Sequence, residues 1–151
     1  MQISQKGLDI LKEFEGLRLE AYRCSAGVPT IGYGWTSGVK MGDVWTREKA
    51  EHMLIEGVKP YERAVQEAIG DAKTSQNQYD AMVSLCYNIG PGNFKKSSVA
   101  RLHKEGKNTQ AAAAFMMWVK AGGKIIGGLI KRRNKEKALY LSCFAMLSSF
   151  C

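Results

Sequence analysis

The fold is decided by the stretch Glu15-Gly-Leu-Arg-Leu-Glu-Ala-Tyr-Arg-Cys-Ser-Ala-Gly-Val-Pro-Thr-Ile-Gly-Tyr-Gly-Trp35. Apolar residues recur at helical spacing just before it, which predicts a helix over residues 3–15 that Gly16 ends. Within the stretch, glycines and one proline interrupt a run of Tyr, Val, Thr, Ile and Trp. This pattern predicts a hairpin or three-stranded sheet over residues 20–40. A carboxylic acid therefore stands at a helix end, and Cys24 and Thr30 follow on the sheet.

The remainder of the chain predicts helices. Thr46 is the expected N-cap of a helix that leads from residue 50 to 57, and Pro60 is expected to open another that ends at residue 70. Ser75-Gln-Asn-Gln78 has the spacing of a capping box before a third helix, which Gly90-Pro-Gly92 stops. Further helices are expected from Ser97 or Ser98, from Asn108 through residue 119, and from about Leu129.

These elements predict an α+β protein forming a single domain over residues 1–151. Its expected parts are a mixed lobe over residues 16–58, a helical lobe over 59–151, and a helix at 3–15 that packs on the helical lobe. A cleft between the two lobes is the expected binding site.

Composition narrows the choice of function without deciding it. The chain has a formal net charge of +8, which favours polyanions such as nucleic acid, anionic lipid or an acidic wall polymer. No apolar run reaches the roughly 18 to 20 residues that span a bilayer. The N-terminus lacks the apolar block of a signal peptide, so we expect the chain to fold in a cytoplasm. The four cysteines match no metal-site spacing, and Cys86 is an expected core residue.

Glu15 is a candidate proton donor. Cleavage of a glycosidic bond needs a proton for the leaving oxygen and a second group on the opposite face. A carboxylic acid that works near neutral pH must be partly buried. Phe14, Leu17 and Tyr22 are the neighbours expected to bury Glu15, and the alternative is a helix-end glutamate that faces water.

Five blocks of sequence carry a resemblance to a known family. Glu15, Cys24 and Thr30 fit the signature Glu, eight residues, Asp or Cys, five residues, Thr. The chain resembles the phage-type lysozymes, glycoside hydrolase family 24, over roughly residues 3 to 142. The blocks that match are residues 15–22, 29–34, 77–90, 111–118 and 131–142.

The resemblance implies a role for each residue of the signature. Glu15 would be the general acid, and Thr30 would hold the attacking water or the substrate. Cys24 stands where many relatives have Asp. A thiol has an ordinary pKa of about 8.5 and is mostly neutral at pH 7 unless a cation lowers that value. Arg18 and Arg23 are the nearby candidates for that cation.

Other residues have two interpretations each. The resemblance implies that Asn88 lines the cleft and binds a sugar acetamido group, and the alternative is a buried amide that caps a helix. Tyr33 and Trp35 either stack on sugar or pack in the core. Trp118 is expected in the core, and His52 and His103 are expected on the surface.

Two regions toward the C-terminus remain open to more than one interpretation. The basic cluster at residues 131–137 is either a solvated face that attracts anionic polymer or a source of buried salt bridges through Arg132 or Arg133. The tail at residues 143–151 is expected to be a packed helix, a membrane-perturbing segment or a disordered addition.

Three function hypotheses follow. The resemblance implies an endolysin muramidase that cleaves the β-1,4 bond between N-acetylmuramic acid and N-acetylglucosamine in peptidoglycan. It would need no cofactor or metal and act as a monomer. It would stay in the host cytoplasm until a holin or another membrane permeabiliser admits it to the periplasmic wall.

The alternatives are a basic nucleic-acid-binding module and a cationic protein that kills through its C-terminal segment. Scattered basic residues argue against the nucleic-acid module.

Overall fold

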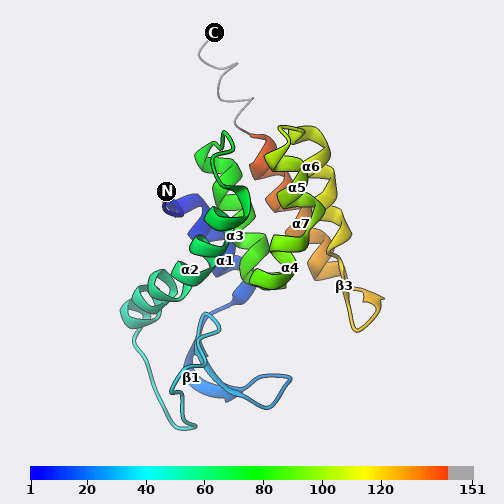
Figure 1. Ribbon diagram of the computed structural model, residues 1–151. Coiled ribbons are helices and arrows are strands. Elements are labelled where there is room, and N and C mark those ends of the chain that lie inside the picture. The colour runs from blue at the N-terminus through cyan, green and yellow to red at the C-terminus, as the bar shows by residue number, and fades with distance from the viewer. Residues whose placement is uncertain (143–151) are drawn as a thin grey trace. The chain divides into compact units, whose positions relative to one another are not determined.

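The computed structural model describes residues 1–142, and the predictions for the tail at residues 143–151 lie outside that range. The described residues form helices and two small antiparallel sheets, which confirms the α+β prediction (Figure 1). The elements are α1 (Gln5–Glu15), β1 (Arg18–Arg23), β2 (Pro29–Gly32), α2 (Arg47–Ile69), α3 (Gln76–Ile89), α4 (Pro91–Lys96), α5 (Ser98–Lys104), α6 (Asn108–Ala114), the 3-10 helix η1 (Phe115–Met117), β3 (Lys120–Ala121), β4 (Lys124–Ile125) and α7 (Gly127–Leu141).

The chain divides into two units. Unit 1 comprises Met1–Ile10 and the chain from Pro60 onward, and unit 2 comprises Leu11–Lys59. Both boundaries fall inside a helix, in α1 and in α2. The expected division into lobes at residues 16–58 and 59–151 stays a prediction.

Unit 2 is built around the hairpin of β1 and β2. The strands pair antiparallel, with Tyr22 opposite Thr30, and their register shifts once between residues 18 and 22. On its other side β1 meets an irregular segment, since Ala21 N–H donates to the Asp43 carbonyl and Trp45 N–H donates to the Leu19 carbonyl. Buried apolar residues from the strands and from α1 and α2 form a small core, which includes Leu11, Ala21, Ile31, Ala50, Leu54 and Val58.

Gly32 shows why this sheet needs glycine. Its φ of +68° lies in the left-handed region, and a Cβ at this position would meet the Trp45 ring at 2.8 Å. A side chain would therefore both strain the backbone and displace the ring. The Trp45 ring therefore packs against β2, the strand that carries Thr30.

The two helices expected around Pro60 are a single helix, so this prediction is wrong. α2 runs from Arg47 to Ile69 with Pro60 inside it, and Thr46 caps its start by accepting a hydrogen bond from Lys49 N–H at 3.1 Å. Proline in a helix interior removes one backbone hydrogen bond, but packing along the rest of a helix can outweigh that loss. The unit boundary falls at the proline.

Unit 1 is a cluster of helices in which α3 packs on α7, and α5 and α6 pack on each other (Figure 1). The capping box of α3 is present as predicted: the Ser75 hydroxyl accepts from Gln78 N–H, and the Gln78 side chain accepts from Ser75 N–H. Cys86 is fully buried in α3, which confirms its core role, and burial raises its thiol pKa to about 12.

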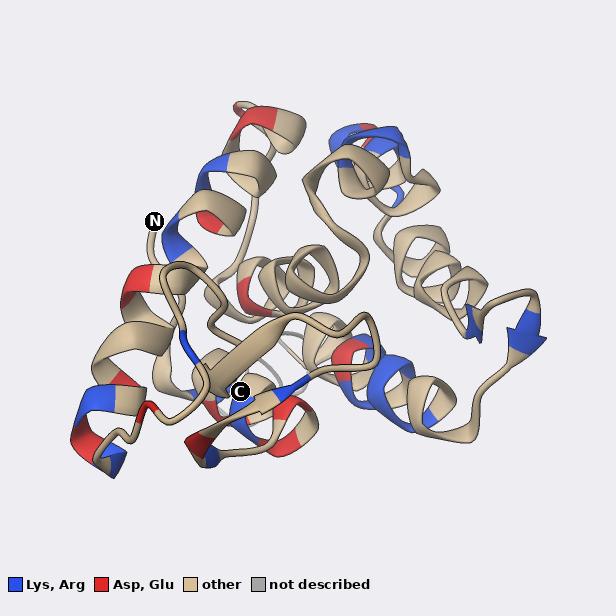
Figure 2. Ribbon diagram, turned by 90° about the horizontal axis from the view of Figure 1, so that it is seen from below, with Lys and Arg blue, Asp and Glu red and all other residues tan. Residues whose placement is uncertain are grey.

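Three local features of unit 1 differ from expectation. A short helix, α4, follows Gly90 directly. The helix expected through residue 119 ends at Ala114 and gives way to η1 and the β3–β4 hairpin, whose basic positions are blue in Figure 2. Lys120 and Lys124 of this hairpin are exposed. Gly127 and Gly128 lie within the first turn of α7 instead of before it.

No helix in the described part of the chain is both long and apolar enough to cross a membrane.

His103 is buried, so its predicted surface position is wrong. It is only 1% exposed and lies on α5, with Nε2 2.7 Å from the Thr74 hydroxyl and Nδ1 2.5 Å from the Tyr140 hydroxyl. Burial lowers the pKa of His103. The imidazole is therefore a neutral link between the start of α3, α5 and α7, whereas His52 is exposed as expected.

We predict that His103 makes unit 1 less stable in mild acid. Its folded-state pKa lies below its unfolded value of about 6.5, so the unfolded state takes up the extra proton as the pH falls through that value. The free energy of unfolding should then fall by up to about 1.4 kcal/mol per pH unit below pH 6.5. Urea unfolding across pH 5 to 7.5 measures this slope.

His103→Gln should reduce the slope by the share due to one group, whatever its effect on stability at pH 7.5. His52→Gln, at an exposed position on α2, is the control and should behave as the wild type. A slope that survives in His103→Gln would contradict the assignment.

Candidate active site

Glu15 is the last residue of α1 and is half-buried. The helix ends there because Gly16 adopts a φ of +73°, with its N–H donating to the Lys12 carbonyl at 3.2 Å. Lys12 also forms an ion pair with Glu51 of α2 at 3.0 Å, which ties this end of α1 to unit 2. Glu15 thus projects from a helix terminus that is fixed on both sides.

Cys24 follows the last residue of β1, where the hairpin turns. Its N–H donates to the Val28 carbonyl at 3.0 Å, and its carbonyl accepts from Gly27 N–H at 2.8 Å. The Arg23 guanidinium closes the turn from outside by donating to the Gly27 carbonyl at 3.1 Å. The turn therefore holds the Cys24 thiol, which is half-buried, in a defined position.

Hydrogen bonds within the turn lower the pKa of the Cys24 thiol from its ordinary value. The largest contribution comes from the backbone amide of Val28, followed by that of Ala26, and desolvation opposes them in part. The Thr30 side chain adds a smaller contribution in the same direction. These groups stabilise the thiolate by donating hydrogen bonds to sulfur.

The arginines expected to favour the thiolate are occupied elsewhere. Arg18 lies over the Tyr22 ring at 4.3 Å from its centre, and Arg23 binds the Gly27 carbonyl. Neither contributes to the lowered pKa of Cys24. The expectation of a cationic cause is therefore wrong, because backbone amides supply the stabilisation.

Thr30 lies on β2 directly beside this turn and is only 3% exposed. Its hydroxyl donates to the Val28 carbonyl at 2.8 Å and also lies within hydrogen-bonding reach of the Cys24 sulfur. A hydroxyl has one proton, so it donates to only one of the two at a time. Thr30 can accept a hydrogen bond from a neutral thiol or donate one to a thiolate.

Tyr33 and Trp35, the two aromatic candidates in unit 2, differ in exposure. Tyr33 is only 5% exposed, which favours core packing over stacking on sugar. Trp35 is half-buried; its ring packs on Gly57 and its indole N–H donates to the Ser37 carbonyl at 2.9 Å.

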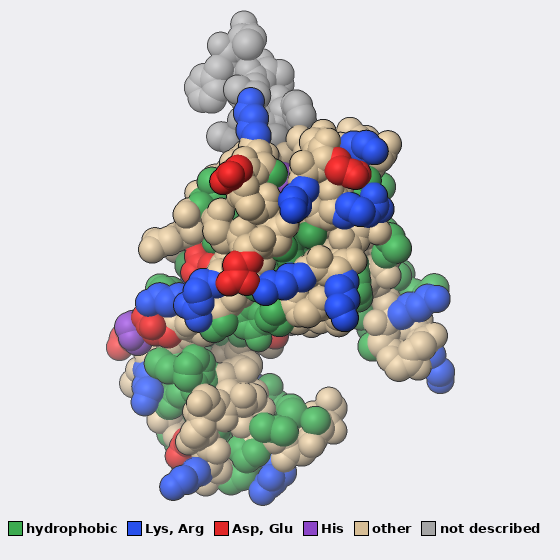
Figure 3. Space-filling model, viewed as in Figure 1, with side chains coloured by type: hydrophobic (Ala, Val, Ile, Leu, Met, Phe, Trp, Pro, Cys, Tyr) green, Lys and Arg blue, Asp and Glu red, His purple; other side chains and the backbone are tan. Residues whose placement is uncertain are grey.

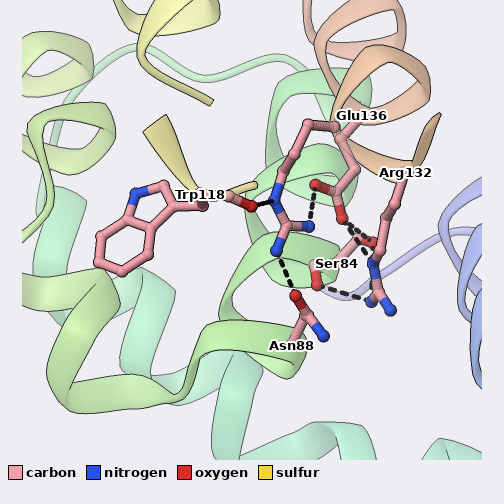
Figure 4. A network of polar contacts seen from close by, with 6 residues as sticks. Ser84, Asn88, Trp118, Arg132 and Glu136 are labelled. Atoms are coloured by element: carbon pink, nitrogen blue, oxygen red, sulfur yellow. Dashed lines mark hydrogen bonds and ion pairs between the residues drawn. The ribbon is translucent and has the colours of Figure 1, made fainter. Parts of the chain in front are cut away.

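Asn88 lies in unit 1, near the end of α3, and its side chain is exposed, so it is not the buried helix-capping amide of the alternative. Its Oδ1 accepts a hydrogen bond from Arg133, and Figure 4 shows its nitrogen directed away from that contact. Arg133 also donates to the Trp118 carbonyl at 2.8 Å. Trp118 itself is half-buried, so the prediction that it belongs to the core is wrong.

A buried carboxylate holds Arg133 in place. Glu136 is fully buried on α7, with its oxygens 2.8 Å from Arg133 Nη1 and 3.1 Å from Arg132 Nε. Ser84 of α3 donates its hydroxyl to Glu136 at 2.5 Å, and its carbonyl accepts from Arg132 at 3.0 Å (Figure 4). Of the two interpretations of the basic cluster, buried salt bridges hold for both Arg132 and Arg133.

Sequence reasoning did not identify Glu136 as the partner of these arginines. The available signal was spacing, since Glu136 follows them by four and three residues, the separations that meet on one helix face. Ser84 gave no comparable signal, because its contact depends on how α3 packs against α7.

We predict that Thr30→Val raises the pKa of the Cys24 thiol. The substitution removes one of the groups that lower it, while the amides of Val28 and Ala26 remain, so the change should be partial. The rate of Cys24 alkylation by iodoacetamide as a function of pH, resolved by peptide mass spectrometry, measures this pKa. Thr36→Val, at an exposed position, is the control. Identical pH profiles for Thr30→Val and wild type would exclude the contact between Thr30 and Cys24.

We also predict that Glu136→Gln lowers the free energy of unfolding by about 3 to 5 kcal/mol, because it leaves two buried guanidinium groups without their carboxylate. Chemical denaturation measures the loss. Glu105→Gln is a matched control, since Glu105 pairs with Arg101 in the same spacing but at the surface, and it should cost less than about 1 kcal/mol. If both substitutions lowered the free energy of unfolding equally, burial of the Glu136 ion pairs would not be what makes them important for stability.

The comparisons with known proteins agree with this fold. The chain is 45% identical over 148 residues to the endolysin of Salmonella phage P22, covering 94% of this chain and 99% of the relative. It is 44% identical over 148 residues to the endolysin of Bacillus phage PZA, again over 94% of this chain, but it spans only 56% of that relative.

A solved structure gives the same picture. The muramidase domain of SpmX from Asticaccaulis excentricus superposes with a TM-score of 0.87 at 38% identity, covering 93% of this chain and 97% of that one. The predicted lysozyme-like fold is thereby confirmed. The family described as Phage lysozyme matches residues 12–136, and the protein belongs to that family.

Proposed function

We propose that the protein is an endolysin muramidase that hydrolyses the β-1,4 bond between N-acetylmuramic acid and N-acetylglucosamine in peptidoglycan. One observation carries the proposal: in a chain of the phage lysozyme family, a single turn of unit 2 joins Cys24 to Thr30 and lowers the pKa of the thiol. Glu15 ends the helix that leads into the same hairpin. These are the three positions of the family signature.

Glu15 is the proposed general acid. Glycoside hydrolysis requires a proton on the leaving oxygen as the glycosidic bond breaks, and the developing centre is oxocarbenium-like. A half-buried carboxyl at the end of the helix that leads directly into the hairpin is suited to donate that proton.

Cys24 takes the proposed place of the second carboxylate. A thiolate there would bring negative charge to the face opposite the proton donor and stabilise the oxocarbenium-like centre. The amides of Val28 and Ala26 make that charge more accessible near neutral pH. Backbone amides would thus position the negative charge on the sulfur atom.

Thr30 is proposed to hold the attacking water. While its proton is donated to the Val28 carbonyl, its oxygen can accept a hydrogen bond from a water molecule. When Cys24 ionises, the same proton can turn toward the sulfur. Thr30 would thus couple the orientation of the water to the charge state of the thiol.

Asn88 is also proposed to contact the substrate. Because Arg133 occupies its oxygen, its amide nitrogen is the group left to donate to a sugar carbonyl such as that of an acetamido group. Substrate contact by Tyr33 is the weaker part of the proposal, given its 5% exposure.

The biological route is also a proposal. As an endolysin the protein would act as a monomer on the periplasmic cell wall. It would reach the wall from the host cytoplasm once a holin or another permeabiliser opens the membrane. Peptidoglycan is its proposed polymeric partner.

The decisive experiment compares wild type with Glu15→Gln on chloroform-treated Gram-negative cells and on purified peptidoglycan. Loss of the general acid should lower the rate of clearing and of reducing-end release by at least about 100-fold. Glu20→Gln removes a carboxylate from an exposed position on the same hairpin and should keep activity. Lysis that survives Glu15→Gln would sink the catalytic assignment.

Cys24→Asp completes the comparison. If the thiol stands in for a carboxylate, this variant should clear cells at least as fast as wild type. Clearing by Cys24→Asp alone, with an inactive wild type, would instead identify a natural loss of function at Cys24.

A further inference from the structure

A basic hollow lies on unit 1, away from the signature residues in sequence. It has a volume of about 380 Å³ and is formed by α4, α5 and the end of α2. Four cationic side chains and one carboxylate line it: Lys95, Lys96, Arg101, Lys104 and Glu105. We call this feature the α4–α5 hollow. Figure 3 shows Lys and Arg side chains gathered on this face over α4 and α5.

The cations in the hollow are only partly neutralised. Glu105 is shared between Arg101 at 3.5 Å and Lys107 at 3.6 Å, and Lys95 pairs with Glu67 at 2.7 Å. Among residues 1–142, neither Lys96 nor Lys104 forms an ion pair. The hollow is therefore lined by more positive than negative charge, and an anion inside it can contact several cations at once.

The backbone beneath the hollow is fixed. Ser97 is only 4% exposed. Its hydroxyl donates a hydrogen bond to the Phe94 carbonyl at 2.7 Å and accepts one from Ala100 N–H at 3.1 Å. This cap sets the angle between α4 and α5, from which Lys96 and Lys104 extend. Small side chains, Ala68 and Ala100, leave the space between them open.

We propose that the α4–α5 hollow binds a phosphomonoester group. Its volume of about 380 Å³ is within the range of small-molecule sites. Lysine is a common phosphate ligand, acting as a point charge with three donors. Free sugar phosphates and phosphates borne by a membrane lipid share this chemistry.

Nucleic acid fits the hollow less well. Single strands bind along extended basic grooves with aromatic side chains on which the bases stack. None of the described residues that line the hollow is aromatic, and its cations converge on one cavity instead of following a track. A compact phosphate group satisfies that arrangement better than a polymer backbone.

Titration with glucose 6-phosphate, followed by NMR of backbone amides, tests the proposal on the full chain. Shifts should concentrate at residues 95–105 and should be absent with glucose. Lys96→Gln combined with Lys104→Gln should weaken binding about tenfold, taking roughly 0.7 kcal/mol for each partly exposed contact. Lys120→Gln combined with Lys124→Gln removes the same charge from the exposed β3–β4 hairpin and should leave binding within about twofold.

Three results would overturn the proposal: shifts spread evenly over the surface, equal weakening by the two double variants, or tighter binding of an oligonucleotide at the same residues. A second arm identifies the source of the phosphate. Sedimentation with phosphatidylcholine vesicles containing phosphatidic acid, if it depends on Lys96 and Lys104, supports a lipid-borne phosphate. Binding of glucose 6-phosphate alone supports a soluble one.

Discussion

The ion cluster at Glu136 is the constraint on which the arrangement of unit 1 depends. A carboxylate with no exposure to water is tolerated only if every lone pair finds a partner, because desolvation otherwise costs several kcal/mol. Two guanidinium groups and the Ser84 hydroxyl meet that demand. They do so for only one alignment of α3 against α7, since a shift of one helical turn would separate Ser84 from Glu136 by about 5 Å. The same alignment brings Arg133 to Asn88.

Unit 2 relies on backbone geometry where unit 1 relies on buried charge. Its turn presents two amides to the Cys24 sulfur, and amide dipoles cannot be neutralised by a change of pH or moved by side-chain rotation. The Trp45 ring packed on Gly32 supports the strand from which Thr30 projects. Because these amides belong to the turn, a carboxylate could replace the thiol at position 24 without moving the turn. This is a physical reason why the family signature admits either Asp or Cys there.

Local rules were enough to predict much of the fold. The end of α1 at Gly16, the caps at Thr46 and Ser75, and the hairpin after Glu15 each follow from neighbouring residues. Pro60 and His103 were misjudged because their state depends on distant contacts: packing along a long helix in the first case, and hydrogen bonds to Thr74 and Tyr140 in the second. The resemblance to phage-type lysozymes predicts roles for the three signature residues, whereas the source of the lowered pKa of Cys24 could not be predicted, because it lies in backbone amides that carry no sequence signal.

Burial also changes how the net charge of +8 should be understood. Arg132 and Arg133 contribute to that total, but they lie inside unit 1 and share a carboxylate, so they add little to the field at the surface. The exposed positive charge is carried by other residues, among them the lysines of the α4–α5 hollow and of the β3–β4 hairpin. Surface charges act within about 10 Å at ordinary ionic strength, so attraction to an anionic surface depends on where exposed cations gather and not on the net charge. The basic run at residues 131–137 therefore has two parts: Arg132 and Arg133 share a buried carboxylate, whereas Lys131 and Lys135 are exposed and add to the surface charge.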